Sequence, residues 1–358
     1  MSRPVLVQVV QELTPGGIQV MVLELERWLG AEFEVHVVSL EGTVDGLRSA
    51  WPRTASLGDR LHALAKAPGV HPATTLRLTR LLARLRPLAV HTHHIGPLLH
   101  GGLAARVACV RRLVHTEHDA WHLDSANHRR LQRAALALFR PRLVADAPAV
   151  AAALQRAIPS SRPRLIANGI DVERFTPGEP AVARRTFGLP QALRLVGTAG
   201  RLEHVKAQDL LIEAFAALPS DVGLAIAGDG SRRDELERLA AALGVRGRVH
   251  FLGHIEDMPA FYRSLDVFCL PSRAEGLPLA LLEAQACGVP AVATDVGGVG
   301  EVLAPGISLG VPAGDVARLA AAIATVLARV TASDPRPFVL DGYGAPAMAA
   351  AYRRLLIS

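Results

Sequence analysis

The feature that most constrains the fold is a regular alternation of two kinds of segment along the chain. Short apolar runs rich in Val and Ile alternate with longer Ala-, Leu- and Arg-rich stretches of helical period. This alternation is typical of βαβ units, in which helices connect the strands of a parallel sheet. We therefore expect an α/β protein. In the first half, the predicted strands are residues 5–10, 34–40, 87–93, 111–118, 141–146 and 162–168, and the predicted helices include 18–29, 74–85 and 129–139.

The alternation starts again in the second half, where the predicted strands are residues 194–200, 223–230, 249–253, 266–272 and 290–298. Two sets of parallel strands indicate two doubly wound domains, and a chain of 358 residues exceeds the roughly 250–300 at which single cores stop growing. The border falls in residues 168–180, where Pro177, Gly178 and Pro180 interrupt regular structure. We assign residues 1–172 to the first domain and 173–340 to the second, and predict an amphipathic helix at 345–357.

Charge is distributed unevenly between the two halves. Residues 1–168 contain 21 Lys and Arg against 12 Asp and Glu, residues 169–358 contain 18 against 21, and 11 of the 14 histidines lie in the first segment. A basic first half favours an acidic partner: nucleic acid, an anionic membrane surface or a phosphorylated substrate. The alternative is a general preference for Arg on solvated helices. With 4% aromatic residues the chain offers few side chains for base stacking, so nucleic acid ranks last.

Composition also narrows the class and the compartment. Half of the residues are hydrophobic and the net charge is only +6, which excludes intrinsic disorder. No run approaches the roughly 18 apolar residues of a membrane-spanning helix, and residues 5–10 are too short for a signal-peptide core. Cys109, Cys269 and Cys287 lack paired spacing and predict neither a disulfide framework nor a cysteine metal cluster. We expect a cytoplasmic protein.

The strongest motif lies in residues 271–298. A buried strand is followed by a turn and by Pro278, which opens a helix, so the loop presents bare backbone amides at a helix N-terminus, where a phosphate binds. Glu275 and Glu283 flank this position at a separation of at most about 12 Å, and carboxylates there would accept hydrogen bonds from sugar hydroxyls. The alternative is that Glu283 is solvated and that Glu275 is favoured only by the helix dipole.

Two further strand-to-helix loops of the second half carry weaker motifs. After the first strand of this half, Arg201 and Lys206 can grip a diphosphate from two sides and stabilise an anionic leaving group, although surface cations are usually only solvated. After the next strand, Gly228 allows either a close backbone approach to a ligand ring or a simple tight turn. Ser231 is the predicted N-cap of the following helix, with Asp234 in the capping-box position.

Histidines gather at two strand ends of the first half, in the runs HTHH and HTEHDAWH, which start at His91 and His115. Because His-x-His begins several metal sites, a metal hydrolase has to be considered. A metallo-β-lactamase-like run would continue with Asp and His, but Ile95 and Gly96 follow here. We therefore predict no metal site and expect His91 and His115 to be hydrogen-bonded core residues.

Taken together, four motifs resemble the retaining glycosyltransferases of family 4, which have the GT-B fold. A Gly-Gly loop opens the first half at Gly16 and Gly17, and an Asn-Gly-hydrophobic-Asp run stands at 168–171. The cation pair and the glutamate pair described above follow in the family's order. The resemblance covers essentially the whole chain. It implies two Rossmann-like domains that face each other across a cleft, with residues 341–358 returning to the first domain.

The resemblance also implies roles for single residues. Glu275 contacts the donor hexose, Glu283 contacts the ribose, and His118 reaches the donor sugar near the reacting carbon. The implied diphosphate ligands are Arg201 and Lys206, the implied acceptor-side residues are His93 and Asp119, and the other implied donor-binding positions are Gly16, Gly17, Gly228, Gly276, Leu277, Pro278, Leu279 and Ala280.

A finer resemblance concerns residues 115–133, which are similar to transferases of bacterial exopolysaccharide clusters with an EHG…LDGSN…R segment. This chain departs from that pattern, because Asp119 replaces Gly and Ser125 lacks the preceding Gly. Ala207 replaces a frequent glycine after the lysine. Since its methyl group is small, we expect the phosphate grip to survive.

These resemblances imply transfer of a hexosyl unit from a UDP- or GDP-sugar to a hydroxyl of a glycan or polyprenyl-diphosphate-linked acceptor, in bacterial polysaccharide or glycoconjugate biosynthesis. Anomeric configuration would be retained through front-face departure, with no cofactor, and Arg201 and Lys206 would replace a divalent metal. A lipid-linked acceptor would place the protein at the inner leaflet of the cytoplasmic membrane, whose anionic surface suits the basic half. Two alternatives stay open: a GT-B nucleotide-sugar epimerase, and a nucleotide-sugar-binding protein without catalysis.

Overall fold

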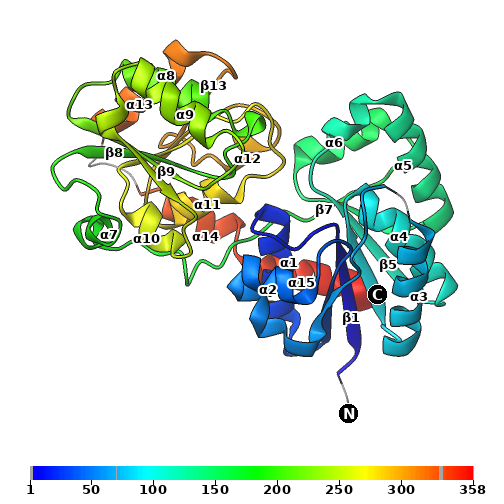
Figure 1. The fold of residues 1–358 in the computed structure, drawn as a ribbon. Coiled ribbons are helices and arrows are strands. Elements are labelled where there is room, and N and C mark those ends of the chain that lie inside the picture. Colours follow the sequence, from blue (N-terminus) through cyan, green and yellow to red (C-terminus); the bar gives the residue numbers. More distant parts are fainter. Residues whose placement is uncertain (1–2, 70, 330–333, 358) are drawn as a thin grey trace. The chain divides into compact units, whose positions relative to one another are not determined.

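The computed structural model describes residues 3–69, 71–329 and 334–357, which form two compact units (Figure 1). Unit 1 consists of Met1–Gly169 and Ala345–Ser358, and unit 2 of Ile170–Gly344. Each unit is built on a parallel sheet, which confirms the predicted α/β protein with two doubly wound domains. These borders lie a few residues from those predicted after 172 and before 341. Ile170 and Gly344 form a parallel bridge, which ties both segments that connect the two units to unit 2.

A seven-stranded sheet organises unit 1. Its strands are β1 (Val5–Val10), β2 (Glu34–Ser39), β3 (Leu61–Ala63), β4 (Ala89–His93), β5 (Arg112–Glu117), β6 (Arg142–Ala145) and β7 (Arg164–Leu165). They lie in the order β3-β2-β1-β4-β5-β6-β7, and every neighbouring pair is parallel. The chain builds outwards from β1 in one direction and then, from β4, in the other. The carboxyl ends of β1 and β4 are therefore the switch point at which such sheets bind ligands.

Helices cover both faces of this sheet. They are α1 (Gly17–Leu29), α2 (Val44–Ala50), η1 (Pro52–Arg60), α3 (Pro72–Leu85), α4 (Ile95–Val107), η2 (Trp121–Asp124), α5 (Ala126–Phe139), α6 (Pro148–Ala157) and α15 (Ala345–Ile357). Successive strand residues face opposite cores: Leu6 packs with α1 and α15, whereas Val7 packs with α3 and α4. Tyr352 of α15 is fully buried in the first of these cores, so the final helix packs on unit 1 as the resemblance implies.

Unit 2 contains a six-stranded parallel sheet. Its strands are β8 (Arg194–Ala199), β9 (Val222–Ala227), β10 (Val249–Gly253), β11 (Val267–Leu270), β12 (Ala291–Thr294) and β13 (Leu309–Val311), in the order β10-β9-β8-β11-β12-β13. The switch point lies between β8 and β11. Its helices are α7 (Pro180–Thr186), η3 (His204–Lys206), α8 (Gln208–Ala216), α9 (Arg233–Ala242), η4 (Arg246–Arg248), α10 (Met258–Arg263), α11 (Leu279–Ala286), α12 (Val299–Val302), α13 (Val316–Ala328) and α14 (Arg336–Gly342).

The sequence predicts neither β3 nor β13. Each strand has only three residues and lies at an edge of its sheet, so it shows neither a period nor a fully apolar run. The other strands match predicted segments to within a few residues at each end. Within the described ranges, no helix combines the length and the apolar character that crossing a membrane requires.

Candidate active site

The loops after β8 and β11 bring two predicted site residues into contact. These strands are neighbours in the sheet, with Val267 paired to Val196, so their carboxyl ends lie together. Lys206 Nζ lies 2.6 Å from Glu275 Oε1, and Ser272 Oγ donates to the same oxygen at 2.5 Å. The Glu275 side chain is 8% exposed and that of Lys206 is 24% exposed. A cation and a carboxylate predicted from separate motifs therefore form one partly buried pair.

The turn of η3 positions Lys206. The backbone N–H of Lys206 donates to Glu203 O at 2.9 Å. The turn ends at Ala207, whose φ of 53° lies in the left-handed region. That region favours glycine, which gives a physical reason for the glycine that is frequent at this position, whereas here an alanine adopts it. Gln208 Nε2 donates to Arg201 O at 3.0 Å and fixes the start of the loop, while the Arg201 side chain is exposed.

Arg273 ties the loops after β8 and β11 together. Its Nη1 and Nη2 lie 3.1 and 2.7 Å from the two carboxylate oxygens of Asp209, and Nη1 also donates to His204 O at 2.6 Å. Arg232 Nη1 lies 3.3 Å from Asp209 Oδ1. Burial opposes ionisation of Asp209, but hydrogen bonds from both arginines lower its pKa to about 2. No sequence motif indicated these contacts of Asp209 with Arg273 and Arg232, because each side chain taken alone is an ordinary surface charge.

Close backbone packing requires glycine at two positions near this pair. A Cβ at Gly297, whose φ is 57°, would lie 1.8 Å from Glu275 O. A Cβ at Gly228, whose φ is 129°, would lie 2.0 Å from Gly200 O. At Gly228 the close neighbour is the protein's own backbone in the loop after β8, and the predicted approach to a ligand ring stays a prediction.

The loop before α11 presents fewer amides than the resemblance implies. Pro278 stands at the N-cap of α11, and because proline lacks an N–H it donates nothing. Leu277 and Leu279 are buried, whereas Gly276 and Ala280 are partly exposed. No side chain caps this helix and its first turn holds no acidic residue. An anion at this helix N-terminus would bind the backbone N–H groups of residues other than Pro278, which has none.

Both glutamates of the strongest motif are largely shielded from solvent. Glu283 is 9% exposed, and Tyr262 Oη donates to its Oε2 at 2.7 Å. Burial, reinforced by the Glu283 charge, raises the pKa of Tyr262 well above its usual value, so the phenol keeps its proton. The interpretation of Glu283 as solvated is therefore wrong. The sequence did not reveal Tyr262, which comes from α10.

The segment after β9 differs from the prediction. α9 begins at Arg233 with Arg232 at the N-cap position, and no side chain caps it. Ser231 instead donates its N–H and its Oγ to Glu203, at 3.1 and 3.0 Å. The prediction of Ser231 as N-cap is wrong because a carboxylate of the neighbouring loop engages both of its donors. Asp234 lies exposed in the first helical turn, where the helix dipole favours its charge.

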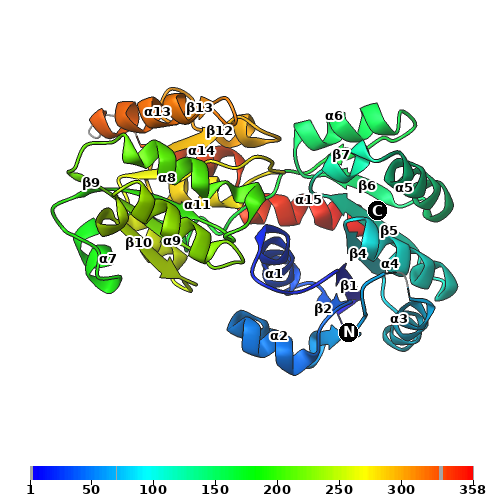
Figure 2. The same cartoon turned by 45° about the horizontal axis from the view of Figure 1, so that its top comes forward.

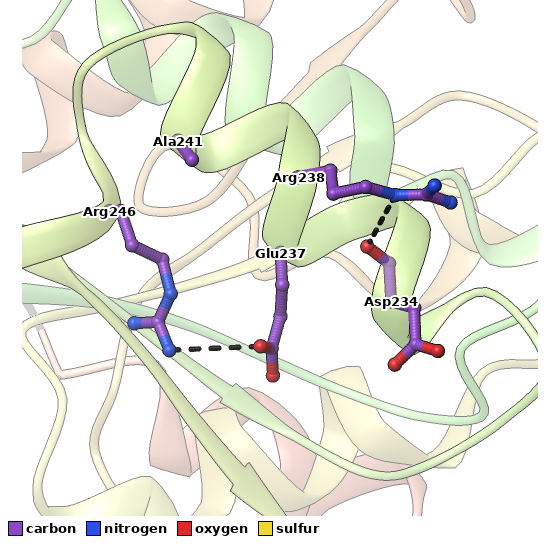
Figure 3. A pocket seen from close by; sticks show the side chains of 5 residues that line it. All are labelled: Asp234, Glu237, Arg238, Ala241 and Arg246. Atoms are coloured by element: carbon purple, nitrogen blue, oxygen red, sulfur yellow. Dashed lines mark hydrogen bonds and ion pairs between the residues drawn. The ribbon is translucent and has the colours of Figure 1, made fainter.

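A pocket along α9 contains none of the predicted catalytic or donor-binding residues (Figure 3). It is lined by Asp234, Glu237, Arg238, Ala241 and Arg246. Arg246 Nη2 lies 3.8 Å from Glu237 Oε2, and Arg238 Nε donates to Asp234 O at 3.2 Å. Within this pocket, one ion pair joins Arg246 to Glu237, and Arg238 donates to a backbone carbonyl of its own helix.

In unit 1, the loop after β1 leads into a helix with an open N-terminus. Gly16 is the N-cap of α1 and Gly17 its first residue, and α1 has neither a side-chain cap nor an acidic residue in its first turn. Gly16 has an extended φ of −177°, and a Cβ there would meet only the flexible end of Gln19. This loop offers backbone donors at the switch point of the sheet.

Four buried polar side chains are linked in a row, from His93 at the end of β4 to Asn168, which lies just before the border of unit 1 at Gly169. His93 Nδ1 lies 3.1 Å from His118 Nε2, and His118 Nδ1 lies 2.9 Å from Asp146 Oδ2. Asn168 Nδ2 donates to the same Asp146 oxygen at 2.7 Å. All four residues are buried. Asn168 therefore orients Asp146, which in turn orients the ring of His118.

Burial sets the protonation of this chain. It lowers the pKa of His118 to about 3, with the charge of His94 acting in the same direction, and it also lowers the pKa of His93. The pKa of the Asp146 carboxyl is raised, again chiefly by burial. Both shifts oppose an ion pair and favour a neutral His118–Asp146 pair that shares one proton.

Asp119 lies between two histidines that the sequence did not single out. Its carboxylate oxygens lie 3.3 Å from His94 Nε2 and 3.5 Å from His122 Nδ1. Burial opposes protonation of His122, but hydrogen bonds to Asp119 and Gln132 raise its pKa to about 9. Burial likewise opposes protonation of His94, but its hydrogen bond with Glu117 and the negative charges of Asp119 and Glu117 together raise its pKa. Asp119 is thus held in place by both histidines.

His91 and His115 are hydrogen-bonded core residues, as expected. His91 Nε2 lies 2.8 Å from Thr116 Oγ1, which also lies 2.9 Å from Tyr352 Oη. His115 Nδ1 lies 3.0 Å from Thr92 Oγ1. Among the residues that the structure describes, no group of three or more His, Cys, Asp or Glu is arranged to hold a metal ion.

Solved structures with this fold define the class of the protein. Anabaena HepE, solved in complex with UDP and glucose, aligns with a TM-score of 0.84 and 22% identity over 99% of both chains. The sucrose-phosphate synthase of Thermosynechococcus elongatus aligns with a TM-score of 0.81 and 22% identity over 99% of this chain and 98% of that one. The two units thus have the GT-B architecture.

Sequence comparison then gives the family. The family model described as Glycosyltransferase Family 4 matches residues 15–174, and the model described as Glycosyl transferases group 1 matches residues 182–332. Each half of the chain thus matches a glycosyltransferase model, in agreement with the resemblance that its motifs carry.

Curated relatives match parts of the chain. The D-inositol 3-phosphate glycosyltransferase of Mycolicibacterium gilvum is 35% identical over 235 residues, which are 64% of this chain and 46% of that protein. The lipopolysaccharide core biosynthesis mannosyltransferase LpsB of Rhizobium meliloti is 38% identical over 151 residues, 40% of this chain and 43% of that protein. The matched part of the chain spans less than half of either relative.

Proposed function

We propose that the protein transfers a hexosyl unit from a UDP- or GDP-sugar to an acceptor hydroxyl, with retention of anomeric configuration. The observation that carries this proposal is the contact of Lys206 with Glu275 at the switch point of unit 2. A cation aimed at a diphosphate and a carboxylate aimed at sugar hydroxyls are both needed to hold a nucleotide sugar, and here they come from adjacent loops.

The Lys206 ammonium and the exposed Arg201 guanidinium would bind the diphosphate and stabilise it as the leaving group. Lys206 has three N–H donors, so it can keep its bond to Glu275 and still reach a phosphate oxygen. Both contacts of the Glu275 carboxylate described above fall on Oε1. Oε2 is therefore the oxygen that we assign to a hydroxyl of the donor hexose.

Nucleotide recognition would use α11, the helix that follows the loop of Glu275. Glu283, held by Tyr262, would accept hydrogen bonds from the ribose hydroxyls. Partly exposed backbone at Gly276 and Ala280 would approach the sugar and phosphates, and Gly228 would keep the β8 and β9 loops close. Anabaena HepE, which shares the fold and was solved with UDP and glucose bound, supports this choice of donor.

In the transfer step the acceptor oxygen bonds to the anomeric carbon as the bond to the diphosphate breaks on the same face. The acceptor proton passes to the departing phosphate oxygen, so that no carboxylate nucleophile is required. His118 would contact the donor sugar near that carbon, and His93 and Asp119 would border the acceptor. No cofactor or metal takes part in this mechanism.

For the acceptor we propose a glycan or a polyprenyl-diphosphate-linked glycan of bacterial polysaccharide or glycoconjugate biosynthesis, handled by a cytoplasmic protein. The name of one relative, LpsB of Rhizobium meliloti, specifies lipopolysaccharide core biosynthesis. The epimerase and the non-catalytic binding protein make different predictions, because neither produces a new glycosidic bond.

The test is transfer from radiolabelled UDP- and GDP-hexoses to an acceptor extract, with the product anomer assigned by proton NMR. We expect an α-linked product from an α-linked donor, activity in the presence of EDTA, and at least about a hundredfold lower turnover for Glu275→Gln and Lys206→Ala. Glu213→Gln, at an exposed position of α8, is the matched control and should retain full turnover. An inverted product, full activity in both variants, or EDTA inactivation that Mg²⁺ reverses would contradict the mechanism.

A further inference from the structure

Three neighbouring helices of unit 1 form a face without acidic side chains. α3, α4 and α5 lie side by side, with α4 in the middle (Figures 1 and 2). Together they contain seven Arg and no Asp or Glu. Solvated helices ordinarily carry charges of both signs, so a face of one sign calls for a partner of the other.

Packing of α4 shapes this face. A Cβ at Gly101 would lie 2.7 Å from Thr92 Cγ2 of the sheet, and a Cβ at Gly102 would lie 2.5 Å from the Phe139 ring of α5. Because neither glycine has a side chain, α4 packs closely against the sheet and α5, and mainly its last turns are exposed to solvent. Arg106, near the end of α4, donates to Phe139 O, which brings the carboxyl ends of α4 and α5 together.

Large apolar side chains are exposed between these arginines. Val107 is 62% exposed and Leu138 is 68% exposed, and both lie at the joined ends of α4 and α5. Leu76, Leu103 and Leu131 are exposed on the same three helices. The partner must therefore accept aliphatic side chains as well as guanidinium groups.

Helix dipoles do not account for this charge. Cations in the last turn of a helix offset its dipole, which explains arginines such as Arg84 and Arg106. Arg80, Arg130 and Arg133 lie further from the helix ends, are exposed, and have no side-chain hydrogen bond or ion pair within the described ranges. Their charge is available to a partner.

We propose that this α3–α5 face binds the surface of an anionic lipid bilayer. Arginines would contact lipid phosphates, and aliphatic side chains would enter the boundary between headgroups and acyl chains. Aliphatic rather than aromatic side chains lie between the arginines of the three helices, which favours lipid over the stacked bases of nucleic acid. The proposal does not depend on the proposed reaction, because none of these residues belongs to the candidate active site.

The test is co-sedimentation of the full chain with vesicles of phosphatidylcholine alone or with 30% phosphatidylglycerol. We expect binding only to the anionic vesicles, with steep loss as salt is raised. The triple variant Arg80→Glu, Arg130→Glu, Arg133→Glu should bind at least about tenfold more weakly. The control with the same change of net charge is Arg185→Glu, Arg238→Glu, Arg329→Glu, at exposed positions of unit 2, and it should bind like the unmodified chain.

A second pair of variants tests the apolar contribution. Val107→Ser with Leu138→Ser should weaken vesicle binding several-fold, whereas Val182→Ser with Leu243→Ser, at exposed positions of unit 2, should not. Thermal unfolding and nucleotide binding, measured on every variant, show whether unit 1 is folded and unit 2 is intact. Equal binding to neutral vesicles, or equal losses in the α3–α5 variants and the unit 2 controls, would overturn the proposal. Binding to duplex DNA without binding to anionic vesicles would also overturn it.

Discussion

Single residues hold Glu275 in place from two directions. Ser272 and Lys206 engage one oxygen of its carboxylate, while the backbone of Gly297 passes so close to Glu275 O that no Cβ fits between them. The orientation of the carboxylate is thus set partly by a glycine that need not touch a substrate.

Gly297→Ala should therefore damage both stability and turnover. Gly306→Ala is a matched control, because Gly306 also has a positive φ of 75° but nothing lies within 4 Å of its added Cβ. The control should cost only the roughly 1–2 kcal/mol of the left-handed backbone. Gly297→Ala should cost more and lower turnover at least about tenfold, as measured by denaturant unfolding and initial rates. Equal effects of the two substitutions would show that the close approach to Glu275 is unimportant.

In unit 1, the single carboxylate of Asp146 accepts from Asn168 and lies within hydrogen-bond distance of His118. Asp146→Asn keeps an oxygen acceptor for both partners, so we expect most of the turnover to remain. Asp146→Leu has a similar volume but leaves both partners unsatisfied in a buried place, which costs about 1–3 kcal/mol for each group. It should lower kcat more than it raises KM, provided that His118 acts at the reacting carbon. Equal kcat values for the two variants would contradict a positioning role for Asp146.

The candidate site was predictable from sequence only where a motif lies in one loop. Glu275 and Lys206 each stand in a strand-to-helix connection whose type is visible locally. Tyr262 and Arg273 were missed because they reach Glu283 and Asp209 across 21 and 64 residues, and single-sequence patterns carry no information about such pairs. Ser231 was misassigned for the same reason, since the acceptor that engages it comes from another loop.

At the scale of elements, α15 belongs to unit 1 although it comes from the C-terminal end of the chain. Its residues Met348, Tyr352, Leu355 and Leu356 are buried in the core formed by β1 and α1. The amphipathic period of this segment predicted a helix, and only the family resemblance placed it on the first domain. Strand prediction followed the same rule: long apolar runs were found, and the three-residue edge strands β3 and β13 were not.

Ending the chain after Gly344 should therefore unfold unit 1 and spare unit 2. Removal of α15 takes several fully buried side chains from one core, each worth about 2–5 kcal/mol, which exceeds the stability of an ordinary domain. Limited proteolysis followed by mass spectrometry should show rapid cleavage within residues 1–169 and protection of 170–344. Tyr352→Phe, which removes only a hydroxyl, is the mild control. Protection of both units in the truncated chain would mean that α15 is dispensable.

At the scale of the whole molecule, the uneven distribution of histidine makes the two units respond differently to acid. Burial lowers the pKa of His62 to about 4 and of His118 to about 3, and it lowers the pKa values of His91 and His93. All four lie in unit 1. Below the unfolded value near 6.5, the unfolded chain takes up protons that the folded unit does not, so stability is lost as pH falls.

The raised pKa of the Asp146 carboxyl acts in the opposite sense, but it is one group against several histidines, so the net effect is a loss of stability as pH falls. Hydrogen exchange measured at pH 7 and pH 5, corrected for intrinsic rates, should show unit 1 losing protection while unit 2 changes little. His122 contributes with the opposite sign at higher pH: its stabilisation is full below 6.5 and disappears as pH rises through about 9. A uniform loss of protection in both units at pH 5 would contradict the assignment.

The most direct test of a nucleotide-sugar site in unit 2 is calorimetric titration of the unmodified chain, Lys206→Gln and Glu275→Gln with UDP, UDP-glucose, GDP and GDP-mannose. We predict that one nucleotide series binds. Lys206→Gln should weaken both members of that series at least about tenfold, because both contain the diphosphate. Glu275→Gln should weaken the sugar nucleotide but leave the free nucleotide unchanged. Unchanged affinity of both variants for the sugar nucleotide would contradict the assignment of the Lys206–Glu275 pair as the donor site.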